Sequence, residues 1–155
     1  TPPEITYQDS MRIYFGGREI ILKYLGKAHT SGDTFIHLPK ERIVFTGDVA
    51  QDGGVPYLGD SYPDEWLDTD DRMAELPVDR FVAGHGPVGD INALKTARDF
   101  IHSLVGSMKS AIADGKDSKT ASDSVLTELQ GQYGNWRSFD RLGESLPDVY
   151  HKLIK

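Results

Sequence analysis

The stretch RIVFTGD, residues 42–48, decides how the rest of this sequence is interpreted. It is a short run of β-branched and aromatic residues, and Gly47 then allows the backbone to turn sharply before Asp48. A carboxylate placed directly after a strand lies at the rim of a sheet, where loops bring side chains together over a rigid scaffold. The stretch therefore predicts a β-sheet that carries chemistry at the ends of its strands.

Similar short runs lie on both sides of this stretch. Each is rich in Ile, Val, Phe or Tyr and is bounded by Gly, Pro or Asp, which is typical of strands rather than helices. These runs are MRIYF (11–15), EIILKYL (19–25), DTFIHLP (33–39) and VDRFVAGHG (78–86). FGGRE (15–19) and LPKER (38–42) predict hairpin connections between successive strands.

One helix is expected within this strand-rich part, over PDEWLDTDDRMAEL (63–76). Its apolar residues Trp66, Leu67, Met73 and Ala74 share one face, and that face is centred close to Asp70. Because carboxylates are rarely buried without a partner, we expect a half-exposed helix end at which Asp70 reaches water. The alternative is that this face packs differently from what its apolar pattern implies.

The pattern changes from Ile91 onward. Apolar residues recur every three to four positions and predict a long helix that stops near Gly115. SKTASDSVLTELQGQY (118–133) predicts a second, weaker helix, and SLPDVYHKLIK (145–155) a short third helix that starts near Pro147. Because no repeat or low-complexity linker separates the two parts, we expect residues 1–155 to form one domain, strand-rich over about 11–89 and helical over 91–155.

Composition limits the classes of function. The chain has 155 residues, 38% of them hydrophobic, and 17 basic against 24 acidic residues give a net charge of -7 that argues against a nucleic-acid partner. No apolar run approaches the roughly 18 residues of a membrane span, so we expect a soluble protein, with cytoplasm and periplasm both open as its compartment. Cysteine is absent. Because the chain starts at Thr1 rather than at methionine, we expect it to be a piece of a longer polypeptide.

Three strand ends carry residues that can bind a metal ion. They are His29 in KAHTSGD (27–33), Asp48, and His85 in AGHG (83–86). Each residue alone is compatible with an ordinary turn. Their common position after apolar strands, in the order His, Asp, His, makes a metal site the better interpretation. Two imidazoles and one carboxylate suit zinc, iron(II) or manganese.

These segments also resemble a family. AHTSGD, FTGD and AGHG resemble the three C-terminal metal-binding motifs of the metallo-β-lactamase fold hydrolases. The resemblance implies a dinuclear zinc site in which His29 and Asp48 are ligands, Asp48 bridges both metals and His85 binds the second. The family's first motif, His-x-His-x-Asp-His, is absent from this sequence. The resemblance is therefore to the C-terminal half of the family's αβ/βα sandwich, an α/β (α+β) fold with a mixed sheet and helices on one face.

The resemblance also implies a reaction. Family members hydrolyse small-molecule substrates by attack of a metal-bound hydroxide on an ester, thioester, lactone or lactam carbonyl. Lactam-cleaving members commonly carry Cys or Ser where this chain has Asp48, so the resemblance favours the glyoxalase II-like or lactonase-like branch. Tyr57 and Tyr62, in the loop that follows Asp48, are candidate substrate contacts. Without the first motif, we expect this chain to be inactive alone.

Partners follow from the same resemblance. Half a sandwich exposes the sheet face that its other sheet covers, so we expect association with the missing N-terminal half of the domain or with a second copy as a homodimer. Two other classes of function stay open. One is a mononuclear iron enzyme, such as a relative of the persulfide dioxygenases, and the other is a metal-free interaction module.

Overall fold

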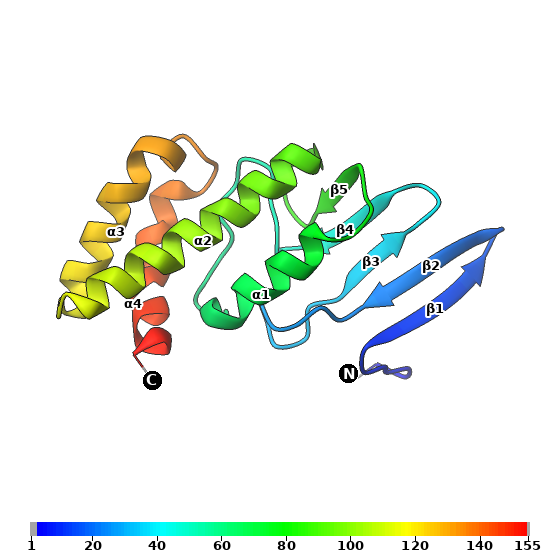
Figure 1. Cartoon of the computed structure of the whole chain (residues 1–155), viewed down its shortest axis with the longest axis horizontal. Coiled ribbons are helices and arrows are strands. Elements are labelled where there is room, and N and C mark those ends of the chain that lie inside the picture. The colour runs from blue at the N-terminus through cyan, green and yellow to red at the C-terminus, as the bar shows by residue number, and fades with distance from the viewer. Residues whose placement is uncertain (1–2, 155) are drawn as a thin grey trace.

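Six strands form one sheet in the order in which they occur along the chain. The computed structural model describes residues 3–154 (Figure 1). The strands are β1 (Ser10–Phe15), β2 (Arg18–Lys23), β3 (Phe35–Leu38), β4 (Ile43–Gly47), β5 (Arg80–Ala83) and β6 (Val88–Asp90). The five expected strands and both hairpins are confirmed. β6 was missed by the sequence pattern, because it has only three residues, one of them glycine.

Neighbouring strands are antiparallel except β4 and β5, which are parallel. A parallel pair needs a crossover connection, and the helix α1 (Pro63–Ala74) supplies it. The carboxyl ends of β4 and β5 consequently lie at the same edge of the sheet. This topology places the residue after Gly47 beside the loop that follows Ala83.

The C-terminal part is helical, as expected. α2 (Ile91–Ala113) and α3 (Ser118–Tyr133) agree with the expected bounds. The expected start of the third helix near Pro147 is wrong, because α4 runs from Leu142 to Leu153. A 3-10 turn, Phe139–Arg141, leads directly into α4, and the burial of Leu142 and Leu146 stabilises the turns before the proline. Pro147 therefore lies inside the helix and does not begin it.

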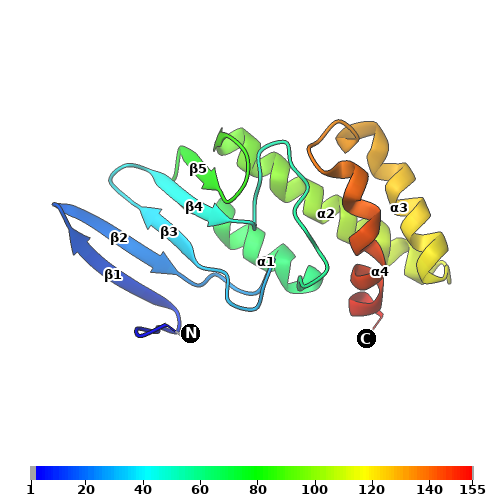
Figure 2. The same cartoon turned by 180° about the vertical axis from the view of Figure 1, so that it is seen from behind.

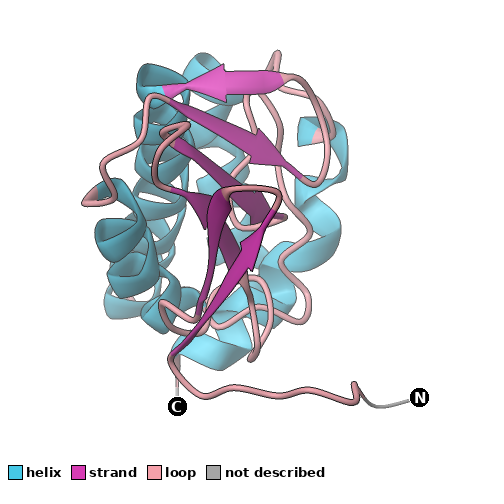
Figure 3. Ribbon diagram, turned by 90° about the vertical axis from the view of Figure 1, so that its right-hand side faces the viewer, coloured by secondary structure: helices cyan, strands magenta, loops and turns pink. Residues whose placement is uncertain are grey.

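The two faces of the sheet differ in what covers them. Ile21, His37, Val44 and Phe81 are aligned on neighbouring strands, and all four are buried beneath the helices. α1 and α2 cover this face, whereas no helix covers the opposite face in the described part of the chain (Figures 1 and 2). The sheet twists along its width (Figure 3). The expected mixed sheet with helices on one face is confirmed.

The uncovered face carries an apolar row that crosses the whole sheet. The strand registers align one residue from each strand: Met11, Leu22, Ile36, Phe45, Val82 and Val88. We call these six residues the open-face row. Phe45 is 37% and Val88 58% exposed. Alternation along a strand thus presents apolar residues on both faces, which is typical of a sheet that is covered on both sides.

Asp70 differs from its expected position. The expectation that it reaches water is wrong, because its residue is only 1% exposed. It lies on the same buried side of α1 as Trp66 and Met73. Burial raises the pKa of its carboxyl well above the usual range, and the positive charge of Arg98 opposes this shift only in part. The helix phase that buries Trp66 also buries Asp70, since the two are four residues apart.

The C-terminal helix is tied to the loop between β4 and α1. The Lys152 ammonium donates hydrogen bonds to the carbonyl oxygens of Gly59 and Ser61, at 2.5 and 2.8 Å. We expect Lys152→Met to lower the free energy of unfolding by about 1–3 kcal/mol, because both bonds are charge-assisted and the site is half-buried. Urea denaturation measures this change. Lys119→Met is the control, since Lys119 is 85% exposed and its pair with Asp123 is worth at most about 0.5 kcal/mol.

No helix among residues 3–154 combines the length and apolar character that crossing a bilayer requires.

Candidate metal centre and adjoining pocket

The loop that carries His29 is fixed on several sides. Asp33 accepts hydrogen bonds from the Thr30 amide and hydroxyl, at 2.9 and 2.8 Å, which closes the turn after His29. The backbone amide of Tyr62 donates to the Ala28 carbonyl at 2.8 Å, so the loop is anchored where α1 begins. The His29 ring packs edge-on against Trp66, with ring centroids 6.1 Å apart. His29 is therefore held by its neighbours and only partly exposed.

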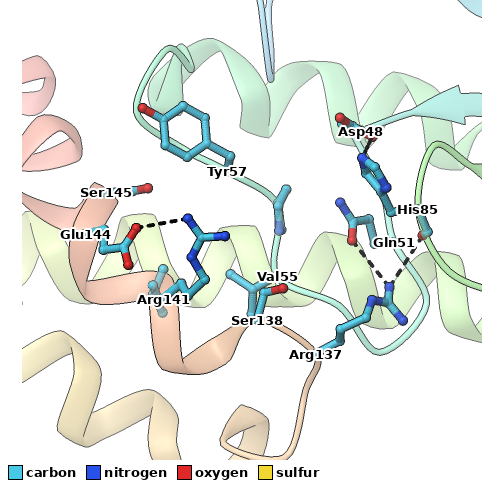
Figure 4. Close-up of a pocket in the computed structure, with 12 residues that line it drawn as sticks. Asp48, Gln51, Val55, Tyr57, His85, Arg137, Ser138, Arg141, Glu144 and Ser145 are labelled. Atoms are coloured by element: carbon cyan, nitrogen blue, oxygen red, sulfur yellow. Dashed lines mark hydrogen bonds and ion pairs between the residues drawn. The ribbon is translucent and has the colours of Figure 1, made fainter.

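Asp48 and His85 come together at the carboxyl ends of β4 and β5. The distance between Asp48 Oδ1 and His85 Nε2 is 3.7 Å, and the two side chains point toward one another (Figure 4). Gly47 makes the turn before Asp48 with φ 56°, and a side chain at Gly84 would collide with the Asp48 carboxylate. The two glycines thus explain how an aspartate and a histidine meet here.

The spacing of this pair fits two ligands of one metal ion. Donors about 2.0–2.2 Å from a common zinc ion in tetrahedral geometry lie about 3.4 Å apart, close to the observed separation. No group of three His, Asp or Glu residues within 3–154 is close enough to hold an ion. The structure therefore pairs Asp48 with His85 and leaves His29 outside that pair. The predicted ligand set remains a prediction.

A pocket adjoins this pair. Its volume is about 490 Å³, within the range of small-molecule sites. Residues of the β4–α1 loop and the start of α4 form its walls (Figure 4). It is lined by Asp48, Gln51, Val55, Pro56, Tyr57, His85, Arg137, Ser138, Arg141, Leu142, Glu144 and Ser145. Of the two tyrosines expected at the substrate, Tyr57 lines this pocket, whereas Tyr62 precedes α1 and has the Lys27 ammonium 4.7 Å from its ring centroid.

The two arginines of this pocket were missed in the sequence. Arg137 follows α3 in a short connection, and Arg141 ends the 3-10 turn. Neither residue lies in a recognisable motif or at a periodic position. Their link to Asp48 depends on a contact between segments more than 80 residues apart, which no local pattern reports.

Two other histidines have structural positions. His37 is buried beneath the helices with no hydrogen-bond partner on either ring nitrogen in the described chain. Burial lowers its pKa, and the nearby charge of Lys23 acts in the same direction. His102 lies on α2, with its Nε2 3.7 Å from the Asp71 carboxylate. Neither histidine lines the pocket beside Asp48 and His85.

Comparison with known proteins supports the family resemblance. Residues 12–85 match the family model of the metallo-beta-lactamase superfamily. The type 2 metallo-beta-lactamase of Bacteroides fragilis is 27% identical over 110 residues, which cover 68% of this chain and 44% of that protein. The type 2 enzyme of a Bacillus species (strain 170) is 28% identical over 99 residues, covering 61% of this chain and 38% of that protein. The chain thus spans less than half the length of these curated relatives.

Solved structures share the fold. A metallo-beta-lactamase from Pontibacter korlensis superimposes with a TM-score of 0.61 at 21% identity, over 66% of this chain and 50% of that one. The stereoselective inverting sec-alkylsulfatase Pisa1 from a Pseudomonas species has a TM-score of 0.71 at 17% identity, over 97% of this chain and 26% of that one. Residues 12–85 therefore match the family model and the curated relatives of the metallo-beta-lactamase superfamily, and the solved structures share the fold of this chain.

Proposed function

We propose that this chain is part of a metal-dependent hydrolase. The observation that carries the proposal is the approach of Asp48 and His85 to 3.7 Å, at the edge where β4 and β5 both end. A carboxylate and an imidazole at this spacing are compatible with one zinc ion. Bound zinc would lower the pKa of a water ligand to about 7 and polarise a carbonyl oxygen.

Each of the three residues has a role in this proposal. Asp48 and His85 would hold one ion, and His29 would help Asp48 to hold a second. The packing of His29 against Trp66 orients the ring for this purpose. Zinc in catalytic sites has three protein ligands, so these three residues cannot complete two zinc sites. The remaining ligands would come from other residues. Iron or manganese suits the same ligand types.

We propose an ester, thioester or lactone as the substrate, in preference to a β-lactam. The support is Asp48, since the resemblance associates an aspartate at this position with the glyoxalase II-like and lactonase-like branch. Tyr57 lines the pocket, where it would contact the substrate, and Tyr62, which does not line this pocket, is proposed as a second contact.

Metal analysis together with hydrolysis tests the function. The protein is loaded with zinc, dialysed and assayed with a thioester, a lactone and a β-lactam, both as the 155-residue chain and within a longer polypeptide that supplies a His-x-His-x-Asp-His segment. Zinc binding with thioester or lactone turnover in the longer protein supports the proposal. Faster cleavage of the β-lactam would overturn the substrate class. One tightly held iron in the chain alone, or no metal in either protein, would overturn the hydrolase.

The open-face row leads to a proposal about partners. We propose that a second sheet covers it, either from the missing N-terminal half of the domain or from another copy of this chain. The support is the apolar row itself, which crosses all six strands opposite the helix-covered face. Exposed apolar surface of this extent drives association.

We therefore expect the 155-residue chain alone to sediment as a dimer or larger species. Replacing Phe45, at the centre of the row, with glutamate is expected to shift the distribution toward monomer, because a charge would then have to be buried in the contact. Sedimentation velocity at several concentrations measures this. Glu65→Gln on the exposed side of α1 is the control. A folded, monodisperse monomer of the unsubstituted chain would refute self-association and leave the missing half as the partner.

A further inference from the structure

We propose that Arg137, assisted by Arg141, makes the pocket beside Asp48 and His85 a subsite for the negatively charged group of the substrate, a carboxylate or a sulfate. The inference rests on the proposed function and deepens it: the substrate would carry a negatively charged group in addition to the bond that is cleaved. Arginine suits this role because its planar fork binds such oxyanions with two parallel hydrogen bonds.

The position of Arg137 is determined by its backbone. Its amide donates to the Gly53 carbonyl and its carbonyl accepts from the Val55 amide, both at 2.9 Å, so that residue 137 is paired with Gly54 in a parallel bridge. These bonds fasten the connection before α4 to the loop that follows Asp48. The backbone of Arg137 is consequently fixed at the pocket wall, and the guanidinium extends from it (Figure 4).

Two glycines make room for the guanidinium. A side chain at Gly54 or at Gly86 would collide with Arg137, and Gly86 also has φ 101°, which L residues with side chains rarely adopt. Gln51 Oε1 and the His85 carbonyl oxygen accept from Arg137 Nη2, each at 3.4 Å. These contacts orient the guanidinium toward His85. They are long and involve only Nη2 of Arg137, so the other N–H groups of the guanidinium remain free to donate to a ligand.

The charges around Arg137 favour an anion. No carboxylate oxygen of residues 3–154 lies within 4.0 Å of its guanidinium, whereas Arg12, Arg18, Arg42 and Arg98 each form an ion pair. Among the described residues Arg72 and Arg80 likewise form no ion pair, but neither lines this pocket. Arg141 lines the same pocket and pairs only with Glu144, at 3.3 Å, through one nitrogen. Arg137 is therefore the main contact and Arg141 a second one.

Anion titration of the metal-free chain tests the subsite. The probes are sodium sulfate and sodium acetate, added at constant ionic strength against sodium chloride after treatment with a chelator, and the readout is the amide NMR spectrum. We expect saturable shifts of the Gly54, Gly86 and Arg137 amides. The probe that binds tighter, sulfate or acetate, identifies the charged group.

The variants separate this site from a general effect of charge. Arg137→Gln is expected to weaken binding about tenfold or more, because a charge-assisted bidentate contact is lost. Arg137→Lys keeps the charge but not the fork, and an intermediate loss is expected. Arg80→Gln removes the same charge from an exposed strand position outside the pocket and should bind as the unsubstituted chain does.

Non-saturable shifts, or equal binding by the Arg137→Gln and Arg80→Gln variants, would overturn the subsite. Its failure is distinguishable from failure of the proposed function because the titration needs neither metal nor turnover. Anion binding without hydrolysis in the longer protein would refute only the function. Hydrolysis that is insensitive to Arg137→Gln and to the charge of the ester would refute only the subsite.

Discussion

In the longer polypeptide that supplies a His-x-His-x-Asp-His segment, Asp48→Asn will lower the zinc affinity at least about 100-fold and will lower hydrolysis to a similar extent. Loss of a residue that merely supports a zinc ligand costs about 10–100-fold in affinity, and loss of a ligand should cost more. Asparagine has the same shape but no charge, so it keeps the packing against Gly84 and removes only the anionic ligand. Competition with a chromophoric chelator measures the affinity.

A matched control separates the ligand from its charge. Asp60→Asn changes an exposed carboxylate in the same β4–α1 connection and is expected to leave both affinity and turnover unchanged. His85→Ala should resemble Asp48→Asn, because the two side chains share one ion in the proposed site. Full zinc affinity in the Asp48→Asn protein would show that the 3.7 Å approach to His85 is an ordinary polar contact.

Asp70→Asn will stabilise the chain at neutral and alkaline pH, by about 1–3 kcal/mol, and will have little effect near pH 4. Burial raises the pKa of the Asp70 carboxyl well above its ordinary 3.8, so the folded state retains the proton that the unfolded state releases. The stability due to this proton is complete below pH 3.8 and is lost as the pH rises through the folded pKa. Asparagine carries no titrating proton and avoids the buried charge.

The measurement is urea denaturation from pH 4 to pH 8 without metal. The difference in unfolding free energy between Asp70→Asn and the unsubstituted chain should grow as the pH rises above 3.8, and it should level off only above the pKa of Asp70 in the folded state. Asp68→Asn, an exposed neighbour on α1, should show no such trend. A difference that is constant across this range would mean that Asp70 has the same pKa in both states.

Most of the fold can be predicted from local patterns. The runs around β2, β3, β4 and β5 are rich in apolar residues and bounded by Gly, Pro or Asp, which predicts strands, and the helical period of α2 persists over the whole length of the helix. The predictions missed β6 and the start of α4 for a common reason, because a three-residue strand and a single helical turn have too little local pattern. Contacts with β5 determine β6, and the preceding 3-10 turn determines the start of α4. The predicted exposure of Asp70 is wrong because tertiary packing buries its carboxyl, although carboxylates favour water.

The candidate site could also be predicted only in part from the sequence. Asp48 and His85 could be expected together, since each follows a strand and parallel neighbours end at one edge. The separation of His29 from this pair depends on how the loop after β2 rests against Trp66, and sequence contains no measure of that. Arg137 and Arg141 reach the pocket through the bridge to Gly54, so only the three-dimensional arrangement connects them with the metal segments.

The bridge between Gly54 and Arg137 has an evolutionary consequence. It joins two parts of the chain that can change independently: the strand-end loops that carry the proposed metal ligands, and the connection between α3 and α4 that carries Arg137. If the proposed subsite holds, substitutions in the connection between α3 and α4 would alter which molecules the pocket accepts without altering the residues around Asp48. A scaffold arranged in this way can diversify its preferences by exchanging one short segment, while the chemistry of the strand ends is inherited intact.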